Sequence, residues 1–224
     1  VGKTSISLNL AATAAIEGYI TCLIDLDPKS DLSKVFLELK ESDLTVYDLI
    51  NYSVPLLECL IETPVDNLFI VPANKSLNKV LKNDSNSEIM FSLKEKLDPY
   101  YLNSRIRPKR DLSYFFKPSK IFEAIVIDTP PALNLLTTIS LIAATHVIIP
   151  IHPSYFCLQG IDDLLTFYGV TKEKYNSTLN LLGYLINNIN FMSDSDKEVE
   201  KILRMNVCNV FSSVIQRNTI IENA

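Results

Sequence analysis

The sequence predicts an α/β fold with a mostly parallel central sheet and helices on both faces. The first observation is that short apolar, β-branched runs alternate along the chain with amphipathic or small-residue segments. The second is size, because 224 residues with 47% hydrophobic content bury one sizeable core. We therefore expect a single domain over residues 1–224.

The apolar runs predict six strands, and capping residues help to place the helices between them. Strands are expected over 19–25, 67–73, 122–128, 146–151, 180–187 and 210–215. Helices are expected to begin near Thr4, Thr45, Ser76, Ser87, Asn134, Leu158 and Asp194. Gly18 is placed to end the first helix in a left-handed conformation, and Thr45 is a plausible N-cap.

Charge and cysteine usage exclude several classes of protein. The formal net charge is -5, with 26 acidic and 21 basic residues, so bulk charge does not favour a polyanion binder. The four cysteines form no C-x-x-C pair, which argues against a zinc site or a disulfide framework and favours a cytoplasmic protein. The apolar tract 135–151 contains His146 and Pro150, and it predicts a helix and a buried strand instead of a membrane span.

Residues 85–120 are predicted to be an insertion or variable region, and the part from 94 to 120 carries eight basic and three acidic residues. Two interpretations stay open. In the first, this stretch is a basic patch interleaved with aromatic residues, and it contacts DNA phosphates. In the second, it is a solvated loop whose aromatic residues pack on the sheet. The basic candidates are Arg105, Arg107, Lys109, Arg110, Lys117 and Lys120.

The tripeptide Gly2-Lys3-Thr4 opens the first predicted helix, and three aspartates follow strands further on. Asp25 and Asp27 lie in "LIDLDP", at the end of one strand, and Asp128 lies in "IVIDTPP", at the end of another. A nucleoside triphosphate needs a helix N-terminus and a lysine for its phosphates, and a hydroxyl and carboxylates for magnesium. Each aspartate alone is also a common cap or turn residue, but all three in this order after the tripeptide favour a nucleotide site.

Longer segments resemble the ParA-type partition ATPases, which belong with MinD-like proteins to the deviant Walker A branch of P-loop NTPases. They are "VGKTSISLNLAA", "GYITCLIDLDPKSDLS", "LTVYDLI", "ETPVDNLFIVPAN", "FEAIVIDTPPALNLLTTISLIAATHVIIPIHPSYFCLQGIDDLL" and "VFSSVIQRN". By this resemblance the signature lysine and the first strand lie upstream of Val1, and further helices follow Ala224.

The resemblance implies a role for each motif residue. Gly2, Lys3, Thr4 and Ser5 wrap the phosphates of ATP, and Thr4 also contacts Mg2+. Asp128 is the Walker B carboxylate, and Asp25 holds the water shell of the metal. Asp27 orients the attacking water, so the expected catalytic residues are Asp27 and Lys3.

The resemblance also places the adenine pocket. Asn187 ends a strand where relatives have an asparagine or threonine near the base, although a strand-end asparagine is also a common turn residue. Arg217 lies in "QRN", where relatives often have Pro-Arg-Asn.

The function that the resemblance implies is DNA partitioning. ATP closes a homodimer, the dimer binds DNA without sequence preference, and a ParB-type centromere-binding protein stimulates hydrolysis, with no membrane involved and a nucleoid-associated cytoplasmic location. Three alternatives stay open: a MinD-like membrane or cargo-positioning ATPase, a metabolic P-loop phosphotransferase, and a nucleotide-binding scaffold or regulator without turnover.

Overall fold

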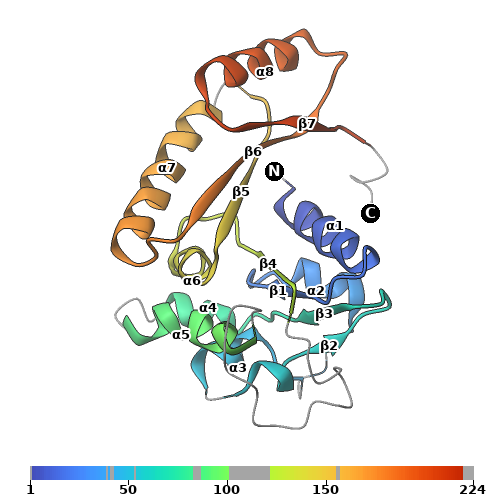
Figure 1. The fold of residues 1–224 in the computed structure, drawn as a ribbon, viewed down its shortest axis with the longest axis vertical. Coiled ribbons are helices and arrows are strands. Elements are labelled where there is room, and N and C mark those ends of the chain that lie inside the picture. The colour runs from blue at the N-terminus through green and yellow to red at the C-terminus, as the bar shows by residue number, and fades with distance from the viewer. Residues whose placement is uncertain are drawn as a thin grey trace. The chain divides into compact units, whose positions relative to one another are not determined.

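The computed structural model describes residues 2–38, 40, 43–52, 54–82, 87–100, 122–154 and 157–218. The chain divides into two compact units (Figure 1). The larger unit is Thr4–Ala143, and the smaller unit combines Val1–Lys3 with Ala144–Ala224. Each unit has its own sheet.

The larger unit contains a four-stranded sheet in the order β2-β3-β1-β4. The strands are β1 (Thr21–Asp25), β2 (Ile61–Glu62), β3 (Leu68–Val71) and β4 (Ala124–Asp128). Strand β1 lies between β3 and β4 and is parallel to both, whereas β2 pairs antiparallel with β3. Every residue of β1 is buried, as expected for an interior strand of a parallel sheet with both faces covered.

Helices cover both faces of this sheet. They are α1 (Lys3–Ile16), α2 (Asp31–Phe36), α3 (Val46–Asn51), α4 (Leu77–Leu81), α5 (Ser87–Leu97) and α6 (Leu135–Ala143), with 3-10 turns η1 (Leu56–Glu58) and η2 (Asp98–Tyr100). Cys22 and Ile24 pack in one apolar cluster with α3, α5 and α6, whereas Leu23 packs in another with α1 and α2. Side chains alternate along β1, so each cluster lies on its own face.

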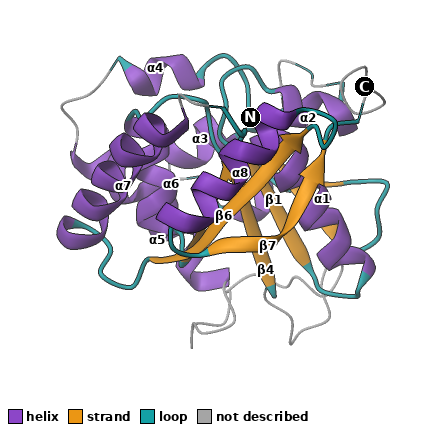
Figure 2. Cartoon of the chain, turned by 90° about the horizontal axis from the view of Figure 1, so that it is seen from above, coloured by secondary structure: helices purple, strands orange, loops and turns teal. Residues whose placement is uncertain are grey.

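The smaller unit contains a three-stranded parallel sheet in the order β5-β6-β7. Its elements are β5 (His146–Ile151), α7 (Cys157–Lys174), β6 (Asn180–Ile189), α8 (Asp194–Asn206) and β7 (Val210–Gln216), and Figure 2 shows β6 beside β7. Its core joins Ile149, Ile151 and Ile186 of the strands to Val199 and Leu203 of α8.

The predicted fold class is confirmed, and the element boundaries move by a few residues. Five of the six predicted strands start or end up to two residues away from the expected positions, and 146–151 is unchanged. Strand β2 and helix α2 were not predicted, because two and six residues are too short for a periodic pattern. Gly18 has a φ of 94°, which confirms the predicted left-handed helix end. The backbone N–H of Thr45 bonds to the Asp48 carboxylate, 2.9 Å away, as in a capped helix start.

Part of the predicted variable region belongs to the core. Helix α5 buries Ile89, Leu93 and Leu97 in the cluster that also contains α3 and α6. The six basic candidates between Arg105 and Lys120 lie outside the described residues. No helix in the described part of the chain is both long enough and apolar enough to span a membrane.

Candidate nucleotide site

Two buried carboxylates lie side by side at one edge of the larger sheet. Asp25 ends β1 and Asp128 ends β4, and the two are direct register partners in neighbouring parallel strands. Neighbouring strands are about 4.8 Å apart. The exposed fractions of the two residues are 0% and 1%. Two adjacent buried carboxylates are costly unless a cation or hydrogen-bond donors compensate them.

Both oxygens of Asp25 accept hydrogen bonds from the chain. Oδ1 accepts from the backbone N–H of Asp27 at 3.0 Å. Oδ2 accepts from the backbone N–H and the hydroxyl of Ser33, at 2.9 and 2.6 Å. Burial raises the pKa of Asp25, and these hydrogen bonds oppose the shift because they stabilise the charged form.

Asp27 is half-buried in the turn between β1 and α2. Its Oδ1 accepts a hydrogen bond from the backbone N–H of Lys29 at 2.9 Å, and its own N–H donates to Asp25. The carboxylate is therefore oriented by a local turn, and its position depends on that of Asp25.

The N-terminal half of α1 contributes a hydroxyl group to this region. The hydroxyl of Ser7 donates to Oδ1 of Asp128 at 3.2 Å. Thr4 lies three residues earlier in the same helix, so the two side chains are on one face. Ser7 was not predicted as a site residue, although the spacing of Thr4 and Ser7 could have indicated it. No acidic residue occupies the first turn of α1, so its positive end is not neutralised from within that turn.

The donor set of the larger unit fits magnesium. Asp25, Asp128 and the Thr4 hydroxyl offer hard oxygen atoms, which Mg2+ prefers. The described residues contain no group of three or more His, Cys, Asp or Glu side chains arranged around one metal position. Two carboxylates are nevertheless enough for Mg2+, which keeps waters and takes its other ligands from substrate phosphates.

In the smaller unit, Asn187 lies against the predicted phosphate loop. Gly2 has a φ of 77°, and a Cβ atom added to it would overlap the Asn187 amide nitrogen. Strand β6 continues through Asn187 to Ile189 instead of ending at Asn187, and its pairing with β7 shifts there. Asn188 has a left-handed φ of 60°, as at a β-bulge that re-aims the neighbouring side chains.

Two further predicted site residues, Arg217 and Ser5, lie just after β7 and in the first turn of α1. Arg217 is exposed just after β7, and its backbone N–H donates to the carbonyl of Ile189 at 2.8 Å, which joins the ends of β7 and β6. Ser5 lies in the first turn of α1, where its carbonyl accepts from the Asn9 side chain at 2.7 Å. Lys3 is the first residue of α1.

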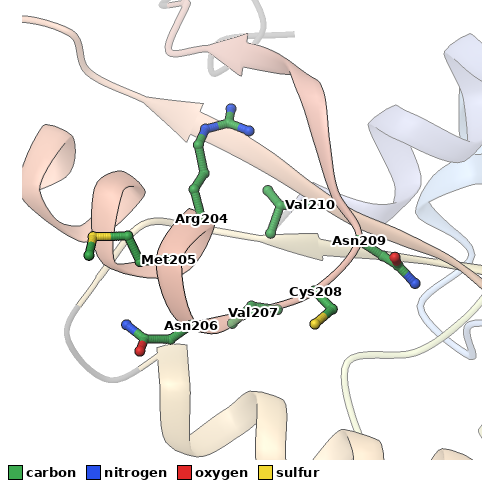
Figure 3. A pocket seen from close by; sticks show the side chains of 7 residues that line it. All are labelled: Arg204, Met205, Asn206, Val207, Cys208, Asn209 and Val210. Carbon is green, nitrogen blue, oxygen red and sulfur yellow. The ribbon is translucent and has the colours of Figure 1, made fainter.

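A pocket of about 370 Å³ lies elsewhere in the smaller unit, where α8 leads into β7 (Figure 3). Arg204 lines it, and its guanidinium bonds the carbonyl of Phe211 and the carboxylate of Glu200. The lining contains none of the predicted site residues. Because Arg204 is used by these internal bonds, we assign the pocket no role in nucleotide binding.

The comparison with known proteins agrees with the motifs. A family model described as an AAA domain matches residues 1–181. The chromosome-partitioning ATPase Soj of Treponema pallidum (strain Nichols) is 31% identical over 225 residues, which cover 100% of this chain and 81% of the relative.

Two solved structures share the fold. A cobyrinic acid a,c-diamide synthase from Mycobacterium smegmatis, with a bound ATP analog and magnesium, has a TM-score of 0.81 at 22% identity, covering 97% of this chain and 83% of its own. A plasmid partition protein from Borrelia burgdorferi has a TM-score of 0.76 at 20% identity, covering 100% and 86%. At such identities they support the fold alone. The family match and the sequence relative carry the assignment: the chain belongs to the Soj and ParA family of partition ATPases.

Proposed function

We propose that this chain binds and hydrolyses Mg-ATP as the switch of a DNA-partitioning system. The observation that carries the proposal is the register pairing of Asp25 with Asp128, which puts two buried carboxylates at the carboxyl ends of two neighbouring parallel strands. Ligands of open α/β sheets bind at this end.

The phosphates of ATP are bound at the start of α1. The first amides of a helix have no partner within the helix, and the helix dipole favours an anion there. Gly2, Lys3, Thr4 and Ser5 supply this end in the proposed site. Lys3 contributes the positive charge for the β- and γ-phosphate oxygens, and Gly2 allows the backbone to approach them closely.

Thr4, Asp25 and Asp128 hold the magnesium ion. Because both oxygens of Asp25 already accept hydrogen bonds, this residue is suited to contacting the metal through its water shell. When bound, the ion neutralises charge on the phosphates and orients them for in-line attack. Ser7 fixes one oxygen of Asp128 from the neighbouring helix.

Asp27 orients the attacking water. One of its oxygens is held by the Lys29 amide, and the half-buried position leaves its carboxylate access to solvent. Phosphoryl transfer depends mainly on positioning and charge stabilisation, so one well-oriented carboxylate has a large effect on turnover. Asn187, within β6, and Arg217, just after β7, border the base in this proposal.

The partition role itself rests on the relatives. Soj of Treponema pallidum, which is 31% identical to this chain, is named as a chromosome-partitioning ATPase. We accordingly propose that ATP closes a homodimer of this chain, that the dimer binds DNA without sequence preference, and that a ParB-type centromere-binding protein stimulates hydrolysis. This activity implies a location on the nucleoid.

An Asp27→Ala variant tests the proposal. We expect it to bind ATP with an affinity similar to that of the wild type, to accumulate as a dimer in light scattering, and to release phosphate at least about 100-fold more slowly. Asp31→Ala is the matched control, because Asp31 is an exposed carboxylate four residues later that forms an ion pair with Lys34 at 2.9 Å. Wild-type protein without ATP turnover, or an Asp27→Ala variant that hydrolyses at the wild-type rate, would contradict the assignment.

A further inference from the structure

We propose that Ser33 is a positioning residue for ATP hydrolysis, which fixes the Asp25 carboxylate, and through it Asp27, to the end of β3. This inference rests on the proposed function, because it gives Ser33 a role in the same site. The hydroxyl of Ser33 bonds Asp25 and Ala73, and the sequence motifs did not single this residue out.

Ser33 makes two hydrogen bonds to one carboxylate oxygen. It lies in α2, and both its backbone N–H and its hydroxyl donate to Oδ2 of Asp25, at 2.9 and 2.6 Å. The exposed fraction of both residues is 0%. Water therefore does not compete for these bonds, and charge-assisted bonds of this length are among the stronger ones in proteins.

The direction of the Ser33 hydroxyl is fixed from its other side. The backbone N–H of Ala73 donates to the same hydroxyl oxygen at 2.9 Å. An amide N–H can only donate, so the hydroxyl oxygen must accept from Ala73 and use its single hydrogen for Asp25. Ala73 is fully buried and follows β3, the neighbour of β1 in the sheet.

These bonds form a continuous chain from the sheet to the proposed catalytic carboxylate. Ala73 donates to Ser33, Ser33 donates to Oδ2 of Asp25, and Oδ1 of the same carboxylate accepts the N–H of Asp27. The carboxylate of Asp27 in turn accepts the N–H of Lys29. A rotation of Asp25 would break its bonds to Ser33 and Asp27 together, so the Ser33 hydroxyl controls where Asp27 lies.

Two substitutions of Ser33 separate positioning from packing. Ser33→Ala removes the hydroxyl and keeps the backbone bond to Asp25, whereas Ser33→Thr keeps a hydroxyl. Ser140→Ala is the matched control, because Ser140 is also buried in the larger unit, with an exposed fraction of 3%, and its hydroxyl donates to the Thr137 carbonyl of its own helix. All are made in the full-length protein.

Turnover is the first readout. Loss of an outer-shell partner lowers activity about 10- to 100-fold. We expect Ser33→Ala to lower kcat by this factor with KM for ATP changed less than about threefold, Ser33→Thr to recover most of the loss, and Ser140→Ala to stay near the wild type. If Ser33→Ala does not yield folded protein, Ser33→Cys replaces it, with a smaller loss of kcat because a thiol is a weak donor and acceptor.

Amide exchange in nucleotide-free protein is the second readout. The Ala73 and Asp27 amide protons both exchange faster in Ser33→Ala, and neither changes in Ser140→Ala. A kcat of Ser33→Ala within twofold of the wild type, an equal loss in Ser140→Ala, or faster exchange at Ala73 without any change at Asp27 would overturn the positioning role.

The two proposals fail differently. If wild-type protein does not hydrolyse ATP, or if Asp27→Ala hydrolyses normally, the proposed function is wrong. If the wild type hydrolyses ATP and Asp27→Ala does not, but Ser33→Ala behaves as the wild type in both readouts, only the role of Ser33 is wrong.

Discussion

The hydroxyl of Ser7 donates a hydrogen bond to Oδ1 of Asp128 over 3.2 Å, although the two residues are 121 positions apart in the chain. The bond joins α1, which begins at the proposed phosphate site, to the end of β4. It orients a carboxylate that is buried beside a second carboxylate, Asp25. The helix that we propose to bind phosphate and the strand that we propose to hold magnesium are thus linked by the Ser7 side chain.

A Ser7→Ala substitution should weaken the magnesium site without unfolding the protein. Removal of an outer-shell hydrogen bond to a metal-binding carboxylate costs about 10- to 100-fold in metal affinity or activity. We expect the magnesium concentration for half-maximal ATPase rate to rise by about tenfold. Thr13→Ala removes an exposed hydroxyl from the same helix and serves as the control. An unchanged magnesium dependence in Ser7→Ala would argue against a metal role for Asp128.

Gly2 and Gly18 both have a left-handed backbone conformation. Alanine substitutions at the two positions therefore separate the cost of backbone strain from the cost of steric overlap. Alanine at Gly18 meets no atom within 4 Å, so Gly18→Ala should cost only the conformational strain, about 1 kcal/mol, and leave ATP binding intact. Alanine at Gly2 would also overlap the amide of Asn187. We expect Gly2→Ala to raise the Kd for ATP at least about tenfold, which corresponds to about 1.4 kcal/mol.

Calorimetric titration of both glycine variants measures this difference. A double variant, Gly2→Ala with Asn187→Ala, should recover part of the lost affinity because the overlap is removed while the strain remains. Equal effects of Gly2→Ala and Gly18→Ala on ATP affinity would show that the contact between Gly2 and Asn187 has no bearing on the site.

The start of α8 gives a pH-dependent contribution to stability. The backbone N–H of Asn190 donates to the Asp196 carboxylate at 2.9 Å, and the Ser193 hydroxyl adds a second bond. These bonds hold the pKa of Asp196 below its ordinary value. Since the folded-state pKa is depressed, the stabilisation is complete above the unfolded-state pKa of about 4 and is lost as pH falls through the folded-state value.

Asp196→Ala should therefore lower the free energy of unfolding by about 1 kcal/mol at pH 7, and the difference from the wild type should be smaller at a pH well below the unfolded-state pKa of about 4. Urea denaturation at the two pH values measures it. Asp194→Ala is the control, because the Asp194 side chain is fully exposed and its ion pair with Lys197 spans 3.5 Å. An equal loss of unfolding free energy in Asp196→Ala at both pH values would contradict the proposed link between the pKa of Asp196 and stability.

The sequence predicted the fold class and the three aspartates because both leave local signals. Buried parallel strands are apolar runs, and a carboxylate directly after such a run is visible without the structure. Asp25 lies opposite Asp128 because β1 and β4, which are about 100 residues apart in the chain, pair in a particular register. Only the folded sheet establishes that register.

Ser33 was missed for a related reason, whereas Ser7 has one local signal, its three-residue spacing from Thr4. A serine in a short helix such as α2 is an ordinary residue until its partner is known, and its partners here are Asp25 and Ala73. The bulge at Asn188 was hidden in the same way, since a left-handed asparagine inside a strand has no distinct sequence pattern. Local propensity thus located the elements, while tertiary hydrogen bonds determined which side chains meet.

Thermal unfolding with ATP, with and without magnesium, tests the central claim most directly. A ligand that binds the folded state raises Tm. The account predicts a larger rise with Mg-ATP than with ATP in EDTA, and loss of this magnesium-dependent increment in Asp128→Asn, each variant being compared with its own nucleotide-free Tm. A Tm that does not respond to Mg-ATP, or an Asp128→Asn variant that keeps the full increment, would contradict it.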